Sequence, residues 1–200
     1  MELSPRLYHW FIRPRFLTDL FINNIIKYDF DFNNKKILDF GSGTGSSSSI
    51  FAPTDYIGID PDPKRIAYAK RLYPNYHFSV FQGSELPVSG NSIDYVLIIA
   101  VLHHIPSDKL PSYLQEFHRI LKPQGKILVI EPCHYKNSHF NNWFMNFFDN
   151  GKYIRNEEGY LEIFRENHFQ TKLLKRYKKL FYNEFFFSAS PYQAKGKEKA

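Results

Sequence analysis

The sequence is poor in cysteine and lacks any long apolar run. Cys133 is the only cysteine among the 200 residues, which excludes an internal disulfide and a cysteine-rich zinc site and favours a reducing compartment. The first residues carry neither the basic start nor the apolar stretch of a signal peptide. The apolar segment 95–105 is shorter than the roughly 18 residues of a membrane-spanning helix. We therefore expect a cytoplasmic protein without a membrane span.

Charge of one sign is not in large excess either. The net charge is +6, and part of this surplus lies in the lysine-rich end of the chain. That end has no apolar period, and we expect residues 191–200 to be a disordered basic tail. Net charge therefore gives only weak support for a nucleic-acid or anionic-membrane partner. Aromatic residues, by contrast, make up 18% of the chain, which favours either a ring-lined pocket or a bulky core.

Short apolar strands alternate with helical segments from Lys36 onward. This alternation predicts a parallel sheet with right-handed crossovers, and the apolar run 95–99 is typical of a central strand covered on both faces. The short connection between 171–179 and 180–189 predicts an antiparallel closing pair. The other predicted strands are 37–40, 56–60, 77–81 and 126–131, and the predicted helices include 64–72, 107–121 and 140–148.

A glycine-rich segment follows the first predicted strand directly. Gly41, Gly43 and Gly45 alternate with Ser42 and Thr44, and we expect them to open a short helix. Glycine has no Cβ atom, so the backbone can turn sharply there and approach a ligand closely. The carboxyl ends of the strands are where doubly wound sheets bind ligands. An ordinary glycine-rich turn is the alternative.

Asp60 ends the second predicted strand, where its carboxylate can accept hydrogen bonds from both hydroxyls of a ribose. Asp62 is better placed to cap the following helix. Together, the glycine segment and Asp60 indicate a cofactor that contains adenosine. A dinucleotide would favour a third glycine at the position of Ser46, at the helix that holds the pyrophosphate. Because S-adenosylmethionine (SAM) has no phosphate, the observed spacing favours SAM over NAD.

The segment Ile-Leu-Asp-Phe-Gly-Ser-Gly-Thr-Gly at 37–45 resembles the first motif of class I SAM-dependent methyltransferases. Further segments resemble later motifs of the same family in the same order, namely 56–60, 91–96, 100–105 and 120–126. Within the family, the chain is most similar to the group with quinone-biosynthesis and many natural-product methyltransferases. The resemblance implies a Rossmann-like α/β fold, with a seven-stranded, mostly parallel sheet, helices on both faces and an antiparallel last strand.

A chain of this length fits one domain. We expect a single methyltransferase domain over residues 1–190, with an N-terminal helical cap (1–30) and a lid-like insertion (134–155). Aromatic side chains of both parts are expected to cover the acceptor, with those of the insertion on one helical face: Phe140, Trp143, Phe144, Phe147 and Phe148, together with Tyr8, Trp10 and Phe11 of the cap. Permanent burial of that face in the core or in a dimer contact is the alternative.

The resemblance also implies which residues bind SAM. Asp39 would orient the glycine segment and approach the methionine amino group, and Asp60 would hold the ribose. Gln82 stands where the family often has an acidic residue near the adenine, but its amide oxygen can accept the same hydrogen bond. The expected set is Asp39, Gly41, Ser42, Gly43, Gly45, Asp60, Pro61, Gln82, Gly83, Ala100 and Val101. No metal ligand is expected.

His103 and His104 follow the central predicted strand, close to where the methyl acceptor must lie. Methyl transfer from a sulfonium is an in-line displacement, so the protein aligns donor and acceptor and in some enzymes also removes a proton. An imidazole can be that base; alternatively, one histidine bonds the backbone and the other packs. Glu131 and His134 are weaker candidates, and Arg155 is a candidate for binding an acidic substrate, although a salt-bridged loop explains it as well.

These observations favour a methyltransferase that acts on a small, aromatic or lipophilic acceptor. A module that binds SAM without turnover, and an RNA methyltransferase that uses the lysine-rich segment 172–179, are the alternatives. The chain lacks an Asn/Asp-Pro-Pro-Tyr/Phe motif after the fourth predicted strand, which weighs against methylation of an exocyclic base amine. Lysines also protect exposed sheet edges from mispairing, so a nucleic-acid partner is not expected.

Overall fold

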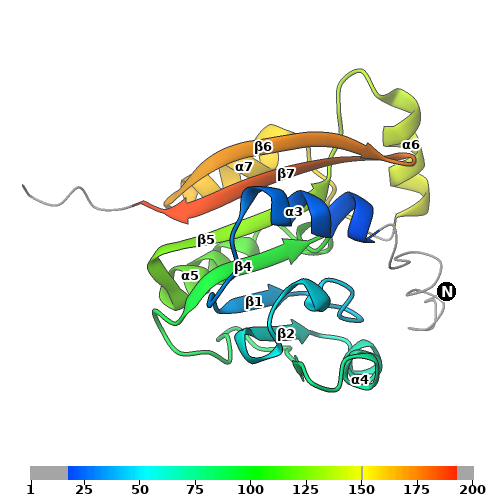
Figure 1. Cartoon of the computed structure of the whole chain (residues 1–200). Coiled ribbons are helices and arrows are strands. Elements are labelled where there is room, and N and C mark those ends of the chain that lie inside the picture. The colour runs from blue at the N-terminus through cyan, green and yellow to red at the C-terminus, as the bar shows by residue number, and fades with distance from the viewer. Residues whose placement is uncertain (1–17, 150, 193–200) are drawn as a thin grey trace, which may run out of the picture.

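The computed structural model describes residues 18–149 and 151–192, and a seven-stranded sheet forms its centre (Figure 1). The strand order is β3-β2-β1-β4-β5-β7-β6. Strands β1 to β5 pair in parallel, and β7 runs antiparallel between β5 and β6, so the expected sheet is confirmed. The strands are β1 (Ile37–Phe40), β2 (Tyr56–Asp60), β3 (His77–Val80), β4 (Ile93–Ile99), β5 (Leu121–Pro132), β6 (Phe169–Lys179) and β7 (Tyr182–Pro191).

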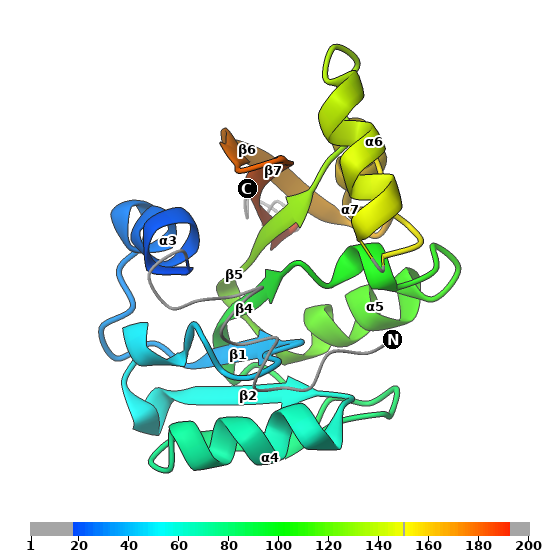
Figure 2. The same cartoon turned by 90° about the vertical axis from the view of Figure 1, so that its right-hand side faces the viewer.

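Helices cover both faces of the sheet (Figures 1 and 2). Val96 and Ile98 of β4 pack in one apolar cluster with α5 and α7, whereas Leu97 and Ile99 pack in a second cluster with α3 and α4. The segment 96–99 of the central strand is therefore apolar throughout because both of its faces are buried. The helices are η2 (Asp19–Asn23), α3 (Asn24–Asp29), α4 (Pro63–Leu72), α5 (Leu110–Ile120), α6 (His139–Phe148) and α7 (Glu157–Glu166), with the short 3-10 helices η3 (Ser48–Ile50), η4 (Pro53–Asp55) and η5 (Leu102–His104).

The helix expected directly after the glycines is absent from this described segment. Turns follow the glycines instead, and only the three residues of η3 (Ser48–Ile50) are helical. Serine side chains compete with the backbone for hydrogen bonds, and the Ser48 hydroxyl donates to the Gly45 carbonyl oxygen at 2.8 Å. The run of four serines from Ser46 therefore favours a tight, buried turn over a regular helix.

The two ends of the expected domain are described only in part. Residues 1–17 of the helical cap and 193–200 of the basic tail lie outside the described residues, whereas Asp19–Asp29 is helical. Among the described residues, none of the helices combines the length and apolar character needed to span a bilayer. The lysine-rich segment forms β6, which is an edge strand of the described sheet. This position agrees with lysines that protect a sheet edge from mispairing.

Candidate cofactor and acceptor site

The glycine loop (residues 41–45) lies at the carboxyl end of β1. Gly41, Gly43 and Gly45 all have positive φ angles, of 80°, 55° and 77°. A Cβ atom on Gly45 would lie 2.6 Å from the Phe78 ring, and one on Gly41 would overlap the side chain of Val101. Among the described residues, a Cβ atom on Gly43 would meet no atom within 4 Å. Gly43 therefore borders open space that a ligand can fill. At Gly41 and Gly45, by contrast, packing against Val101 and Phe78 requires glycine.

Asp60 joins the glycine loop to the end of β2. Its carboxylate oxygens accept hydrogen bonds from the Gly43 and Asp62 backbone N–H groups, each at 2.9 Å. The side chain is buried, and this burial raises its pKa. A carboxylate has about four acceptor sites, so Asp60 can hold the loop and still accept hydrogen bonds from two ribose hydroxyls.

Asp39 is buried beneath the same loop. The hydroxyl of Tyr56, at the start of β2, donates to Asp39 Oδ2 at 2.6 Å, and burial together with the Asp39 charge raises the tyrosine pKa well above its usual value. Sequence reasoning missed Tyr56, which looks like an ordinary apolar strand residue. The neighbouring Ser42 hydroxyl is buried and has no hydrogen-bond partner in the described part of the chain, so the loop also offers a free polar atom.

Gln82 and Pro61 meet at the ends of β3 and β2. The Gln82 side-chain amide donates to the Pro61 carbonyl oxygen at 2.9 Å, and both residues are exposed, as is Gly83. This bond directs the amide nitrogen toward the protein. The amide oxygen of Gln82 is thus left to accept a hydrogen bond, as expected for a residue beside an adenine.

The loop after β4 lies against the glycine loop and is organised by Glu131. Ala100 has a positive φ of 54°, and the backbone N–H groups of Val101 and Leu102 both donate to Glu131 Oε1 at 2.7 Å. Glu131 is fully buried. The carboxylate therefore caps η5 from the end of the neighbouring strand β5, and it places Ala100 and Val101 beside Gly41.

His103 lies between two carboxylates. Its Nδ1 is 2.7 Å from Glu131 Oε2, and its Nε2 is 3.4 Å from Asp149 Oδ1. Burial alone lowers the pKa of His103, but the charges of Glu131 and Asp149 outweigh burial and raise the pKa to about 9. His103 is therefore an imidazolium at neutral pH.

His104 lies at the exposed edge of this cluster, with its ring centre 4.1 Å from that of His103. Partial desolvation and the positive charge of His103 lower the pKa of His104 to about 4, so His104 is neutral. His103, His104 and Asp149 also place possible metal-ligand atoms within 4.8 Å of one another. Since both ring nitrogens of His103 face carboxylates, the geometry favours a proton on each nitrogen over a metal ion.

A model of the methyltransferase domain family matches residues 38–129. The demethylmenaquinone methyltransferase of Chlorobaculum parvum is 30% identical over 118 residues, which are 58% of this chain and 48% of that protein. The ubiquinone/menaquinone biosynthesis C-methyltransferase of Rickettsia felis is 35% identical over 125 residues, which are 56% of this chain and 50% of that protein. Residues 38–129 thus match the methyltransferase domain family, as the motifs in the sequence predict.

Solved structures show the same fold over most of this chain. A possible histamine N-methyltransferase of Thermotoga maritima has a TM-score of 0.71 at 15% identity and covers 92% of this chain and 96% of its own. The magnesium protoporphyrin IX methyltransferase of Synechocystis, solved with bound SAH, has a TM-score of 0.69 at 17% identity and covers 90% and 85%. The curated relatives are longer, since this chain spans about half of their length. SAM is the cofactor of this family, and Gly43, Ser42 and Asp60 suit it.

The segment after α6 fixes the histidine loop, which is the loop after β4 that carries His103 and His104. The Tyr153 backbone N–H donates to the His103 carbonyl oxygen at 3.0 Å. The Arg155 guanidinium donates to the carbonyl oxygens of Leu102 and Ile105 at 3.1 and 3.0 Å, and it also bonds Tyr153 and Ser107. The suggestion that Arg155 binds an acidic substrate is thus not supported, because its terminal nitrogens are already used within the protein.

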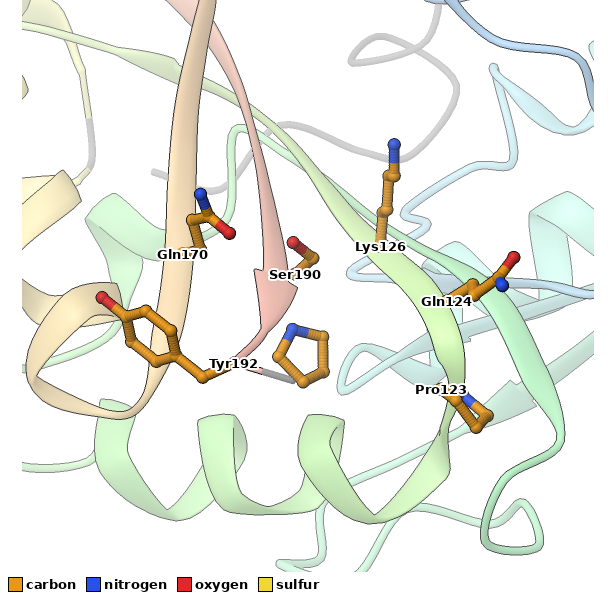
Figure 3. Close-up of a pocket in the computed structure, with 7 residues that line it drawn as sticks. Pro123, Gln124, Lys126, Gln170, Ser190 and Tyr192 are labelled. Carbon is orange, nitrogen blue, oxygen red and sulfur yellow. The ribbon is translucent and has the colours of Figure 1, made fainter. Parts of the chain in front are cut away.

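His134, the weaker catalytic candidate, also has structural partners. Its ring Nε2 lies 2.9 Å from Asn146 Oδ1 of α6, and its backbone N–H donates to the Arg155 carbonyl oxygen at 3.1 Å. A hollow elsewhere on the structure (Figure 3) is lined by residues at the amino end of β5 and at the paired ends of β6 and β7. It lies at the amino end of β5, whereas the glycine loop lies at the carboxyl end of β1. None of the expected site residues line it.

Gly43→Ala and Gly45→Ala are expected to have opposite consequences. Alanine at Gly43 should cost only about 1 kcal/mol of stability from the positive φ but should weaken SAM binding roughly tenfold or more, because its methyl group enters the open space. Alanine at Gly45 should cost about 3 kcal/mol or more through contact with Phe78. Chemical denaturation and SAM calorimetry on both variants measure this difference. Equal SAM affinity for Gly43→Ala and wild type would place the cofactor elsewhere.

Proposed function

We propose that this protein transfers the methyl group of SAM to a small lipophilic acceptor and that His104 accepts the proton which the acceptor loses. The observation that supports this proposal is the neutral His104 beside a His103 imidazolium held by Glu131 and Asp149. The cluster follows β4, next to the glycine loop on β1. A quinol is a reasonable first acceptor, because the similar proteins from Chlorobaculum parvum and Rickettsia felis are named for demethylmenaquinone and ubiquinone/menaquinone biosynthesis.

SAM would supply an activated methyl group on its sulfonium, and the acceptor would attack that methyl group in line, with S-adenosylhomocysteine as the leaving group. Gly43 and Asp60 hold the cofactor, and the buried His103 ring positions His104. The lowered pKa keeps His104 unprotonated, so its ring can accept a hydrogen bond from the acceptor. The acceptor becomes strongly acidic as its bond to the methyl group forms, so even a weakly basic imidazole takes the proton at that stage.

The alternatives differ in what they require of the site. A SAM-binding module without turnover has no use for a positioned neutral imidazole, and it is distinguished by SAM binding without product. An RNA methyltransferase would need its basic surface beside the cofactor. The lysine-rich strand β6 is instead separated from β1 by β4, β5 and β7, so the described structure offers no support for that alternative.

His104→Gln is expected to reduce turnover on the order of 100-fold while leaving SAM affinity nearly unchanged. Glutamine keeps a polar side chain of similar reach but cannot accept a proton at neutral pH. S-adenosylhomocysteine release with a short-chain quinol as acceptor measures turnover. The exposed His77 on β3 provides the matched control, and His77→Gln should behave as wild type. A loss of only a few-fold for His104→Gln would leave alignment of donor and acceptor as the whole mechanism.

A further inference from the structure

The amphipathic helix α6 is oriented with its polar side toward the protein. The Asn142 side chain bonds both the backbone N–H and the carbonyl oxygen of Tyr135, at 3.2 and 2.8 Å. The Asn141 side chain donates to Asn183 of β7 at 3.1 Å, and Met145 is fully buried. The helix is thus attached through asparagines and one methionine. Most of its aromatic side chains are exposed in the described structure, so the alternative of burial in the core is not supported. The expected lid over the acceptor stays a prediction, because its expected cap partners Tyr8, Trp10 and Phe11 lie outside the described residues.

The opposite side of α6 and the turn between β6 and β7 form a continuous aromatic face. The Phe181 ring of the turn lies 5.8 Å from Phe140 and 5.0 Å from Phe144, and Trp143 stacks on Phe147 at 5.8 Å. Six members of this face are at least half exposed, namely Phe140, Trp143, Phe147, Phe148, Leu180 and Phe181. Large apolar side chains clustered in this way mark an interaction surface.

Lysines flank the elements of the aromatic face along the chain. Exposed Lys136 lies shortly before α6, exposed Lys152 lies shortly after it, and exposed Lys178 lies near the end of β6. Neither α6 nor the turn at 180–181 contains an aspartate or a glutamate. An apolar face with Trp and Phe, flanked by lysines, is the composition of segments that lie in the interface of an anionic bilayer.

The aromatic face also lies on the side of the sheet where β1 and β4 end. In Figure 1 the arrowheads of β1 and β4 point toward the side where α6 stands, and Figure 2 shows α6 projecting from the body of the protein. The chain leaves α6 directly into Asp149, which contacts His103. A surface bound there would therefore lie at the same edge as the candidate acceptor site.

We propose that the aromatic face docks onto the surface of an anionic lipid bilayer. Its projecting shape suits a planar partner, and the flanking lysines complement acidic headgroups. A second copy of this chain fits less well, because a twofold contact would bring the flanking lysines of both copies together. Docking itself does not depend on the proposed function; delivery of a lipophilic acceptor from the bilayer would rest on it.

Vesicle binding by the full chain tests the proposal without SAM or an acceptor. The Trp10→Phe background leaves Trp143 as the only tryptophan, so its emission reports on the aromatic face. Vesicles of equal parts phosphatidylcholine and phosphatidylglycerol should shift this emission to the blue and co-sediment with the protein, whereas pure phosphatidylcholine should bind weakly. Phe147→Ser should reduce partitioning about tenfold, and Lys178→Glu should reduce it about as much.

Tyr28→Ser is the matched control, because Tyr28 is 90% exposed and its helix α3 stands apart from α6 in Figure 2. It should bind vesicles as the Trp10→Phe background does, and all three variants should keep the melting temperature of that background because Tyr28, Phe147 and Lys178 are exposed. Absence of binding to anionic vesicles, or binding that Phe147→Ser leaves unchanged, overturns the proposal. A blue-shifted Trp143 in a concentration-dependent dimer without vesicles also overturns it and assigns the face to a second copy. Turnover in the quinol assay is scored separately, so failure of docking and failure of the proposed function are distinguishable.

Discussion

Glu131→Gln should lower the free energy of unfolding by about 3 kcal/mol or more and abolish most of the turnover. The fully buried carboxylate accepts two backbone N–H groups at Oε1, and Oε2 faces both the ring Nδ1 and the backbone N–H of His103. A glutamine places an NH₂ group where one of these oxygens was, so donors face donors. The His103 cation then loses its closest counter-charge in a buried environment, which is the costly way to break an ion pair.

The control for Glu131→Gln is Glu157→Gln. Glu157 also forms a close ion pair, with Arg176 at 2.7 Å, but the arginine side chain is 57% exposed. Such a pair should contribute only about 0–1 kcal/mol. Urea denaturation of the two variants at neutral pH gives the comparison. Similar small losses in the free energy of unfolding for both variants would show that Glu131 does not hold the histidine loop.

The same contact predicts how stability depends on pH. The folded-state pKa of His103, about 9, lies above the value of about 6.5 for an unfolded histidine. The stabilisation is therefore fully present below about pH 6.5 and is lost as the pH rises through about 9, with a total on the order of 3 kcal/mol. His103→Gln should flatten this part of the stability curve. Above about pH 9 the free energies of unfolding of the variant and the wild type should differ least.

The fold and the cofactor loop could be predicted from the sequence because both depend on local patterns. The apolar run of β4 requires burial on both faces, and Gly41 and Asp60 end β1 and β2 at one edge of the sheet. The turn after the glycine loop could be less well predicted, because the choice between a helix and the η3 turn depends on buried serine contacts such as that of Ser48.

The sequence predicts His103 and His104 as catalytic candidates, but it does not predict that Glu131 and Asp149 contact the His103 ring. Glu131 and Asp149 are far from His103 along the chain, and only the end of β5 and the end of α6 bring them to its ring. Periodicity showed that the aromatic residues of α6 share a face but not which way that face points. The orientation depends on the pairing of Asn141 with Asn183 of β7, a contact without any local signal.

Asp60→Asn should weaken SAM binding by about 2 kcal/mol, or roughly 30-fold. The asparagine retains one oxygen acceptor, but its NH₂ group must face the backbone N–H of either Gly43 or Asp62, and the charge-assisted bonds to the ribose are lost. Because burial raises the pKa of Asp60, wild-type affinity should begin to fall on acidification at a higher pH than an exposed aspartate would give.

Asp62→Asn is the control that separates this loss from a general disturbance of the loop. Asp62 caps α4 through the Lys64 backbone N–H and pairs with Arg65, so its replacement should cost some stability and leave SAM affinity unchanged. Calorimetry with SAM and with NAD on wild type and both variants decides the matter. Wild-type affinity in a folded Asp60→Asn variant would remove Asp60 from the cofactor site. Tighter binding of NAD than of SAM would instead contradict the assignment of the loop to a nucleoside without phosphate.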